Sequence, residues 1–369
     1  MRIPWCCATL AITCGILVAA DAEGRKERGR PVVGAIRWDA WHGEASNVGL
    51  VVEKTLSPQR WHYRLPFYGV EVSPTQVQVR ANTQAIMDRE IAYARAAGLD
   101  YWAFVTYAPD AAMSLGLKLY LSSTRKGDIN FCLNLQGGCV GAGGAKNWPA
   151  QVARYVGCFK EPAYQKVAGG RPLVYLFQAG DMVGQGKFAS WSDARAAFDE
   201  LRKATVAAGL PTPYIVAQHW SPPTARDHAD KLGLDAVGAY ASNGGGKRAP
   251  YAQLAAHTEK WWDAFRETRA KVVPLATTGW DRRPRVENNV PWEPAGGDPD
   301  AYYESPAPRE LAAHLKAALD WNAAHPKAAE AKAILIYAWN ETDEGGWLVP
   351  THAEGAKRLD AIGDVLKKR

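Results

Sequence analysis

The sequence has few cysteines, and their spacing does not suit a metal site. Six occur in the chain: Cys6, Cys7, Cys14, Cys132, Cys139 and Cys158. No CxxC, HxH or HExxH pattern is present, so zinc chemistry is not indicated and no cofactor is expected. The last three leave two alternatives open. Cys139 and Cys158 could form a disulfide in an oxidising compartment, or all three could be free thiols.

Blocks of like charge and flexible linkers are also missing. The formal net charge of +6 is spread along the chain without a lysine- or arginine-rich stretch. It therefore indicates at most a mild preference for anionic polymers, and it gives no reason to expect nucleic acid as a partner. Because no Pro/Ser-rich linker or low-complexity segment divides the chain, we expect a single globular domain and a monomer.

Only one long apolar run occurs, and it lies at the amino terminus. Met1 and Arg2 precede an uncharged stretch over Ile3–Ala19, and small residues follow. This order predicts a signal peptide over residues 1–22, cleaved after Ala20 or Ala22, and a secreted or periplasmic protein. The run is shorter than the about 20 residues that a spanning helix prefers, so no membrane span is expected after the signal is removed.

Eight short apolar runs, rich in β-branched and aromatic residues, recur along the rest of the chain. They are Val32–Trp38, Tyr101–Thr106, Ile129–Leu135, Leu173–Gln178, Tyr214–Gln218, Ala236–Ala241, Val272–Thr277 and Ala333–Trp339. Most are too continuously apolar for a sheet with one solvent-exposed face, which is typical of buried parallel strands.

Helical patterns separate these runs. Apolar residues share one face in the sets Met87, Ile91, Ala94; Leu254, Trp261, Phe265; Leu311, Leu315, Ala318; and Leu359, Ile362, Leu366. Eight strands alternating with helices predict one α/β domain over residues 23–369, a (β/α)8 TIM barrel. The long stretch from Asp39 to Ala81 is unusual for a barrel and predicts a functional flap over the site, whereas the glycine-rich segment 137–144 predicts a mobile loop at the barrel mouth.

Polar and aromatic residues follow the predicted strands. Because barrel enzymes build their active sites at the carboxyl ends of the strands, these residues are candidates for substrate binding. They are Trp38, Asp39, Trp41, His42, Tyr107, Gln178, His219, Trp220, Tyr240, Trp280, Asp281, Arg282, Trp339 and Asn340. Aromatic rings stack on the apolar faces of sugars, and amides, carboxylates and arginine bind hydroxyls, so the mixture favours a carbohydrate ligand.

The eighth strand ends in three acids within four positions, Glu341, Asp343 and Glu344. Like charges crowded in a cleft repel one another, and burial disfavours ionisation, so at least one carboxyl group should have a raised pKa. A protonated acid beside an ionised carboxylate is what cleavage of a glycosidic bond requires. A solvated acidic turn or a set of Ca²⁺ ligands would show the same pattern.

Four segments resemble the WbsX-like proteins of the glycoside hydrolase family 71/99-like superfamily. AWNETDEGGWLVP at residues 338–350 is similar to the signature AWNEWxEGxxLEP, and TGWDRRPR at 278–285 to the segment GWDxxPR. FKEPAY followed by GRPLV, at 159–164 and 170–174, looks like the family's approach to strand four. MDREI through GLD, at 87–100, looks like the helix before strand two.

The resemblance implies a TIM barrel and, from the endo-α-mannosidases of family 99, retaining cleavage without a metal or redox cofactor. It implies that Glu344 is the general acid/base. Glu341 would deprotonate the sugar 2-hydroxyl, which attacks the anomeric carbon to give a 1,2-anhydro sugar. Thr342 and Asp343 replace the Trp and His of the family 99 motif NEWHEG, which aligns with residues 340–345, and Val349 replaces the Glu before the last Pro of the signature. The resemblance therefore does not imply mannan as the substrate.

The leading hypothesis is a secreted glycoside hydrolase acting on a polysaccharide or oligosaccharide. One alternative is a carbohydrate-binding or surface-glycan assembly protein on the same barrel, without catalysis. A further alternative is a metal-assisted hydrolase that uses Asp39, His42, His219 and Asp281, since carboxylate and imidazole bind several divalent ions.

Overall fold

The computed structural model describes residues 30–367, so the predicted signal peptide lies outside the described residues. The barrel strands are β1 (Val32–Arg37), β4 (Tyr101–Thr106), β5 (Asn130–Gln136), β7 (Arg171–Phe177), β8 (Tyr214–Gln218), β9 (Ala236–Gly238), β10 (Lys271–Val272), β11 (Leu275–Thr277) and β12 (Ala333–Tyr337). All eight predicted strands are present, most of them within two residues of the expected bounds at each end.

The sheet is parallel and closes into a barrel. Its strand order is β10-β9-β8-β7-β5-β4-β1-β12-β11, with β6 (Lys166–Val167) pairing outside this path on β7. The two end strands, β10 and β11, belong to one continuous segment, 271–277, interrupted at Pro274, which has no N–H to donate to a neighbour. Because β10 pairs with β9 and β11 with β12, this segment joins the two edges of the sheet. The predicted (β/α)8 fold is confirmed.

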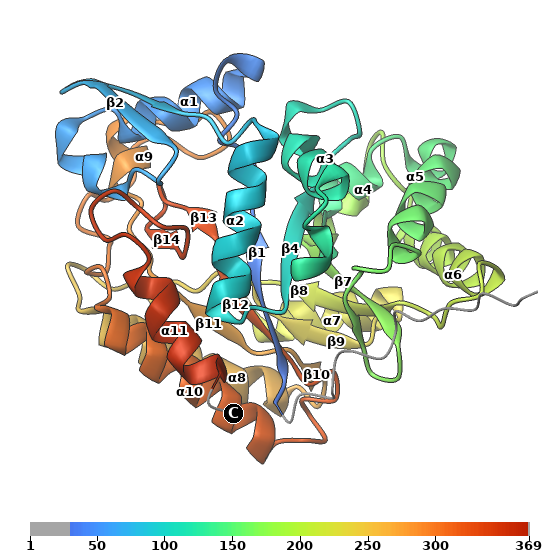
Figure 1. The fold of residues 1–369 in the computed structure, drawn as a ribbon. Helices are drawn as coiled ribbons and strands as arrows, with labels where there is room; N and C mark the ends of the chain where they lie inside the picture. Colours follow the sequence, from blue (N-terminus) through green and yellow to red (C-terminus); the bar gives the residue numbers. More distant parts are fainter. Residues whose placement is uncertain (1–29, 368–369) are drawn as a thin grey trace, which may run out of the picture.

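Helices surround the barrel (Figure 1). They are α2 (Gln84–Ala97), α3 (Leu115–Ser122), α5 (Gly144–Phe159), α6 (Trp191–Ala207), α7 (Pro222–Leu232), α8 (Tyr251–Glu267), α10 (Pro308–Ala324) and α11 (Lys357–Lys367). Local signals fix their ends. In α2, for example, the Thr83 side chain accepts a hydrogen bond from the N–H of Ile86, and Gly98 ends the helix with φ +79°.

The remaining elements lie between these units. They are α1 (Asn47–Leu56), α4 (Gly137–Gly141), α9 (Arg283–Glu287), the hairpins β2 (Gly69–Ser73) with β3 (Gln76–Val79) and β13 (Asn340–Glu341) with β14 (Gly346–Trp347), and the 3-10 turns η1 (Gly43–Ala45), η2 (Gln59–Arg64), η3 (Ala112–Ser114), η4 (Lys126–Asp128) and η5 (Ala179–Met182).

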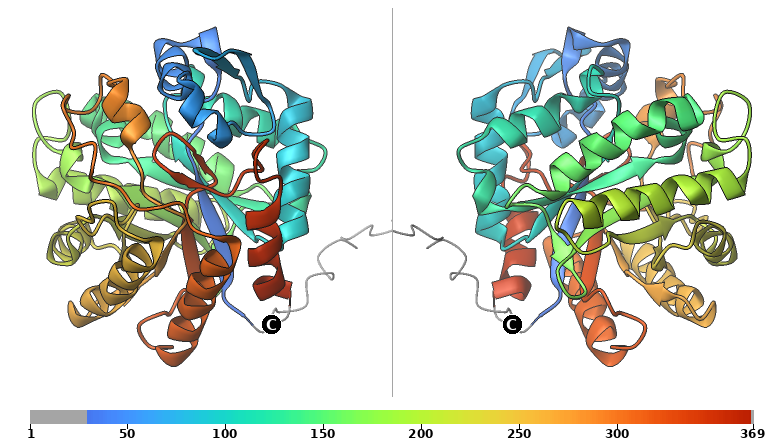
Figure 2. Two further views of the ribbon diagram at one scale, coloured as in Figure 1. Left: turned by 90° about the vertical axis from the view of Figure 1, so that its left-hand side faces the viewer. Right: turned by 90° about the vertical axis from the view of Figure 1, so that its right-hand side faces the viewer.

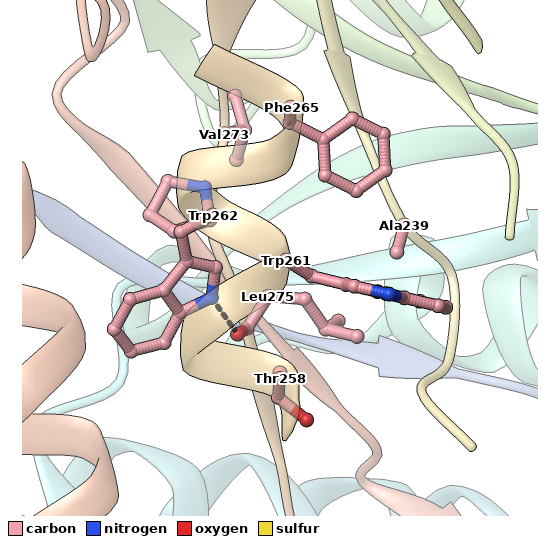
Figure 3. A pocket seen from close by; sticks show the side chains of 8 residues that line it. Ala239, Thr258, Trp261, Trp262, Phe265, Val273 and Leu275 are labelled. Atoms are coloured by element: carbon pink, nitrogen blue, oxygen red, sulfur yellow. Dashed lines mark hydrogen bonds between the residues drawn. The ribbon is translucent and has the colours of Figure 1, made fainter. Parts of the chain in front are cut away.

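The layer between barrel and helices is densely packed with aromatic side chains. Figure 3 shows α8 against β9–β11, where Trp262 donates a hydrogen bond from Nε1 to the carbonyl oxygen of Leu275 at 2.7 Å. The hollow there has no room for a water molecule, so it is core and not a ligand site. Trp262, and not the predicted Trp261, is the more deeply buried of the two adjacent indoles.

The long insertion after β1 is ordered and folds into η1, α1, η2 and the β2–β3 hairpin. Figures 1 and 2 show it in blue at the same end of the barrel as α9 and the β13–β14 turn. Arg64 of η2 donates to the carbonyl oxygens of Asp281 and Thr342, which fastens the insertion to two other loops of that end. It supplies Val48 to the cavity described below.

The glycine-rich segment is helical and not the loop that we predicted. It forms α4 and the start of α5. Its glycines allow close packing: a Cβ added to Gly137 would lie 2.0 Å from the carbonyl oxygen of Gln178, and one on Gly141 would lie 2.6 Å from that of Met182. The absence of side chains therefore serves the contact between α4 and η5.

The state of the cysteines and the presence of membrane-spanning helices can both be addressed within residues 30–367. Cys132, Cys139 and Cys158 are all free thiols. None of the helices in this range combines the length and apolarity that crossing a membrane requires.

A buried charge network lies behind the barrel wall between β1 and α2. Arg37 donates to Asp39 from Nε and to Glu90 from Nη2, both at 2.8 Å. Glu90 also accepts a hydrogen bond from Trp339 Nε1, so the network connects β1, α2 and the end of β12. Asp39 packs so closely on α3 that a Cβ on Gly116 would lie 2.1 Å from its carboxyl group.

The environment of Asp39 should make stability depend on pH. Burial raises the pKa of Asp39 to about 6, against the attraction of Arg37, and Glu90 adds to the rise. The folded state then holds a proton that the unfolded state releases near pH 4, so the stabilising contribution is present at acid pH and is lost as pH rises through about 6.

We expect the unfolding free energy of the wild type, relative to Asp39→Asn, to fall by about 2–3 kcal/mol between pH 4 and pH 7.5. Urea denaturation of both proteins across this range measures the difference. Asp110→Asn, at an exposed position, is the control and should follow the wild type. Parallel curves for wild type and Asp39→Asn would show that the network does not hold this proton.

Candidate active site

A cavity of about 540 Å³ opens at the carboxyl ends of the barrel strands. Its lining residues come from almost every strand–helix connection: Trp38, Val48, Tyr107, Met113, Gln136, Phe177, Gln178, Trp220, Tyr240, Ala241, Trp280, Arg282, Arg285, Trp292, Glu293, Pro294, Glu341 and Glu344. This volume is large enough for a small oligosaccharide unit, and a mostly apolar wall with a few convergent polar groups is typical of ligand sites.

The two glutamates reach this cavity through a tight turn after β12. Glu341 lies on β13, and the turn back to β14 passes through Gly345, whose φ is +86°. A Cβ on Gly345 would lie 2.5 Å from the backbone nitrogen of Asp281, which itself donates to the carbonyl oxygen of Glu344 at 2.6 Å. Glycine at this position therefore allows the turn to pack against the loop after β11 and fixes where both carboxyl groups point.

Arg285 of α9 is the cation at the centre of the acidic turn. Its Nε donates to Asp343 at 2.7 Å, and its Nη1 donates to Glu344 and, at 2.7 Å, to Glu293. Its Nη2 lies 3.7 Å from a carboxylate oxygen of Glu341. Four carboxyl groups therefore surround one guanidinium whose side chain is only 5% exposed. Burial alone would lower the pKa of Arg285, but these carboxylates outweigh burial and raise it.

The contacts of the two glutamates differ. Glu344 accepts hydrogen bonds from Arg285 and from the hydroxyl of Tyr337. Glu341 accepts one from the hydroxyl of Tyr240 at 2.9 Å, and the arginine stands further away. Burial, followed by the charge of Glu344, raises the pKa of Glu341 well above its ordinary value, although Arg285 opposes the shift. The surroundings therefore favour the protonated form of Glu341.

Aromatic rings line both sides of this pair. Trp38 and Trp292 meet edge to face with ring centroids 6.0 Å apart, and both lie within 6 Å of Arg285. Phe177 stacks on Tyr240 at 4.4 Å and meets Trp220 edge to face at 5.1 Å. Trp220 and Trp292 are 41% and 40% exposed, so large apolar surfaces face solvent at the cavity. Such surfaces suit the apolar faces of sugar rings.

The structure brings nine of the predicted site residues to the cavity: Trp38, Tyr107, Gln178, Trp220, Tyr240, Trp280, Arg282, Glu341 and Glu344. The other seven do not line it: Asp39, Trp41, His42, His219, Asp281, Trp339 and Asn340.

Four of the seven support the cavity from behind. Asp39 and Trp339 belong to the buried network of Arg37 and Glu90. Asn340 exchanges two hydrogen bonds with the backbone of Trp38, from which it accepts at 3.0 Å and to which it donates at 2.9 Å. The Trp41 indole donates to the carbonyl oxygen of Asn340 at 2.7 Å. These side chains fix Trp38 and the end of β12 without facing the ligand space.

Of the remaining three, the two histidines contact their own loops and Asp281 binds arginines. His42 contacts the carbonyl oxygen of Asp39 and the hydroxyl of Ser46, and His219 accepts from the N–H of Ser221. Asp281 forms ion pairs with two arginines of neighbouring segments, Arg64 and Arg283. Burial would raise the pKa of Asp281, but Arg283 and Arg64 outweigh it and lower that pKa.

The structure does not assemble the metal site that we considered. Asp39, His42, His219 and Asp281 are engaged as just described, and within residues 30–367 no three His, Cys, Asp or Glu side chains are placed to hold a metal ion. The metal-assisted alternative therefore has no ligand set in this part of the chain.

Sequence reasoning did not select several lining residues, of which Arg285, Trp292 and Glu293 matter most. Arg285 stands in the TGWDRRPR segment, so the motif could have indicated it. Trp292 and Glu293 lie between α9 and α10 in a segment without helix or strand. No periodicity there indicates which way a side chain points. A tryptophan beside an acid between two prolines offered only a weak signal.

Comparisons with known proteins support the fold. No family model matches the sequence, and no curated protein matches it. Two solved structures of the GH99 endo-alpha-mannosidase from Bacteroides thetaiotaomicron, one in complex with BIS-TRIS-propane, are similar to this chain with a TM-score of 0.54 at 12% identity. Each match covers 91% of this chain and 96% of the mannosidase chain. The structure thus resembles a GH99 barrel over nearly its whole length, although the two sequences are only 12% identical.

Removing Arg285 should destabilise the protein in a pH-dependent way. Arg285→Met leaves Asp343, Glu344 and Glu293 without their shared cation, and breaking such a buried cluster costs about 3–5 kcal/mol. The carboxyl pKa values then rise in the folded state, so the loss should be largest near pH 8 and smaller near pH 5.

Urea denaturation at both pH values measures the loss. Arg60→Met is the matched control, since Arg60 is 62% exposed and pairs with Glu287 at the surface, where a pair contributes less than about 1 kcal/mol. An equal loss at both pH values for Arg285→Met would indicate lost packing and not unbalanced charge.

Proposed function

We propose that this protein is a glycoside hydrolase that cleaves a polysaccharide or oligosaccharide at the Glu341–Glu344 pair. The observation that carries the proposal is that Glu341 and Glu344 both line an aromatic cavity at the carboxyl end of the barrel, where burial raises the pKa of Glu341. One protonated and one ionised carboxyl is the minimum equipment for acid/base cleavage of a glycosidic bond.

The resemblance to the signature supplies the roles. Glu344 protonates the glycosidic oxygen while Glu341 accepts the proton of the 2-hydroxyl, and the freed O2 displaces the leaving group from C1. The leaving group departs as an alcohol, and a 1,2-anhydro sugar remains. Water activated by Glu344 then attacks C1, Glu341 returns a proton to O2, and the anomeric configuration is retained. Since the sugar provides the nucleophile, neither carboxylate has to reach C1.

These roles require a shift of the shared proton. The contacts of the ligand-free site favour a proton on Glu341, because Arg285 and Tyr337 both donate to Glu344. Substrate binding must therefore move this proton from Glu341 to Glu344. A sugar 2-hydroxyl that donates to Glu341 would favour that change, because it stabilises the ionised form of Glu341.

The surrounding residues suit a sugar chain. Trp38 and Trp292 on one side, and Phe177 and Trp220 on the other, offer rings against which sugars can stack, while Gln178 can bind hydroxyl groups. The barrel resembles a structure named as an endo-alpha-mannosidase, so α-mannans belong among the candidate substrates. The replacement of the Trp-His of the family 99 motif by Thr342-Asp343 is the reason to test other glycans with equal care.

A polysaccharide panel and two variants test the proposal. We expect wild-type protein to release reducing sugar from at least one polysaccharide, and Glu344→Gln and Glu341→Gln to lower the rate by 10³-fold or more, in line with about 10²–10⁴ for a lost acid or base. Glu304→Gln, at an exposed position, is the control and should keep the wild-type rate.

A substrate with a good leaving group separates the two roles. An aryl or fluoride glycoside needs little protonation on departure, so Glu344→Gln should release the leaving group of the first turnover at close to the wild-type rate, with later turnovers limited by slow attack of water, while Glu341→Gln stays inactive. If Glu341→Gln alone recovered activity on this substrate, Glu341 would be the acid/base and Glu344 would be the base for the 2-hydroxyl. If wild-type protein binds glycans, and releases no product from any of them, the non-catalytic binding alternative holds instead.

A further inference from the structure

Glu293 has no role in the mechanism above, yet it binds Arg285, the cation at the centre of the acidic turn. It lies in the segment between α9 and α10, beside Trp292, and its side chain is 18% exposed. One carboxylate oxygen accepts from Arg285 Nη1 at 2.7 Å, and the other pairs with Arg282 Nη2. Both arginines of the cavity thus bind this one carboxylate.

The same two arginines also face Glu344. The Nη1 of Arg285 that donates to Glu293 donates to Glu344 as well, and Arg282 Nε lies 3.7 Å from the same Glu344 oxygen. Two acids therefore compete for one pair of cations. Without Glu293, both guanidinium groups would direct their charge at Glu344 and its neighbours.

We propose that Glu293 is a positioning residue for the carboxyl pair, which acts by drawing Arg282 and Arg285 partly away from Glu344. This inference rests on the proposed function for its catalytic meaning, although the charge coupling is a property of the protein alone. A neutral amide at position 293 would keep the shape and leave both arginines free to stabilise ionised Glu344 and Glu341.

Groups from every neighbouring element contribute to the field at this pair. Asp343, Glu341 and Glu344 come from the turn after β12, Tyr337 from β12 itself, Tyr240 from the end of β9, Arg282 and Arg285 from the start of α9, and Glu293 from the segment after α9. Arg64 of the insertion adds a further cation but is paired with Asp281. Of the acids among them, Glu293 alone lies outside the β12 turn.

The direction of the effect follows from Coulomb's law. Losing the negative charge of Glu293 raises the positive potential at the pair, which favours the carboxylate over the carboxylic acid. The protonated member then loses its proton at a lower pH. For charges separated by several ångströms and partly shielded from water, the shift should be roughly one pH unit.

The test compares Glu293→Gln with wild type by two readouts. The alkaline limb of the pH profile of kcat/KM, on whichever glycan the wild type cleaves, should move to lower pH by roughly one unit. NMR titration of ¹³C-labelled glutamate carboxyl groups should show the same shift, and Glu341→Gln and Glu344→Gln spectra assign the signals. Glu287→Gln is the matched control: Glu287, at the end of α9, also binds an arginine but faces Arg60 and Trp61, so it should shift neither readout.

The outcomes separate the two proposals. A shift in the NMR titration with no activity in either protein would keep the charge coupling and reject the glycosidase. Activity with unshifted pH profile and titration would overturn the inference, and a raised KM alone would then show that Glu293 only holds the segment in place. An equal shift in Glu287→Gln would also overturn it, because the effect would then reflect overall charge.

Discussion

The arrangement of this site depends on how one buried arginine is shared among its acids. The turn after β12 brings Glu341, Asp343 and Glu344 together, which would be unfavourable without a counter-charge. Arg285 contacts the last two directly and extends to Glu293 on a third segment. The turn, helix α9 and the segment after it must therefore keep their relative positions, since moving any one leaves a buried carboxylate unpaired. Tight packing of Gly345 on the loop after β11 serves the same end.

A second set of polar residues sets the position of this cluster from behind. Trp339 points to Glu90 of α2, while Asn340 holds the backbone of Trp38 at the end of β1. Both residues point away from the cavity although they directly precede Glu341, which lines it, so nearness in sequence to Glu341 does not place a side chain in the cavity. Polar groups that looked like substrate ligands are thus part of the support that orients Trp38 and the acidic turn.

The barrel could be predicted because each strand is a continuous apolar run and each helix repeats its apolar face. The ends of strands could be located for the same reason, which placed Glu341, Glu344 and Tyr240 near one another. The direction of each side chain after a strand could not be predicted, because irregular backbone has no period. Trp41 and Asp281 therefore entered the candidate set although they face other loops. Glu293 was missed because its segment, between α9 and α10, has no pattern at all, and its distance from the β12 turn is fixed only by the fold.

The balance of charge in the cavity differs from that of the whole chain. The chain carries a formal +6, but the site opposes two arginines, Arg282 and Arg285, to four acids, Glu293, Glu341, Asp343 and Glu344. With all acids ionised the balance would be two positive against four negative charges. A buried site relieves such an excess by taking up protons, and burial raises the pKa of Asp343 as well as that of Glu341. Asp343 thus adds a third acid beside the pair, and the local excess of negative charge favours protonation there, whatever the charge of the outer surface.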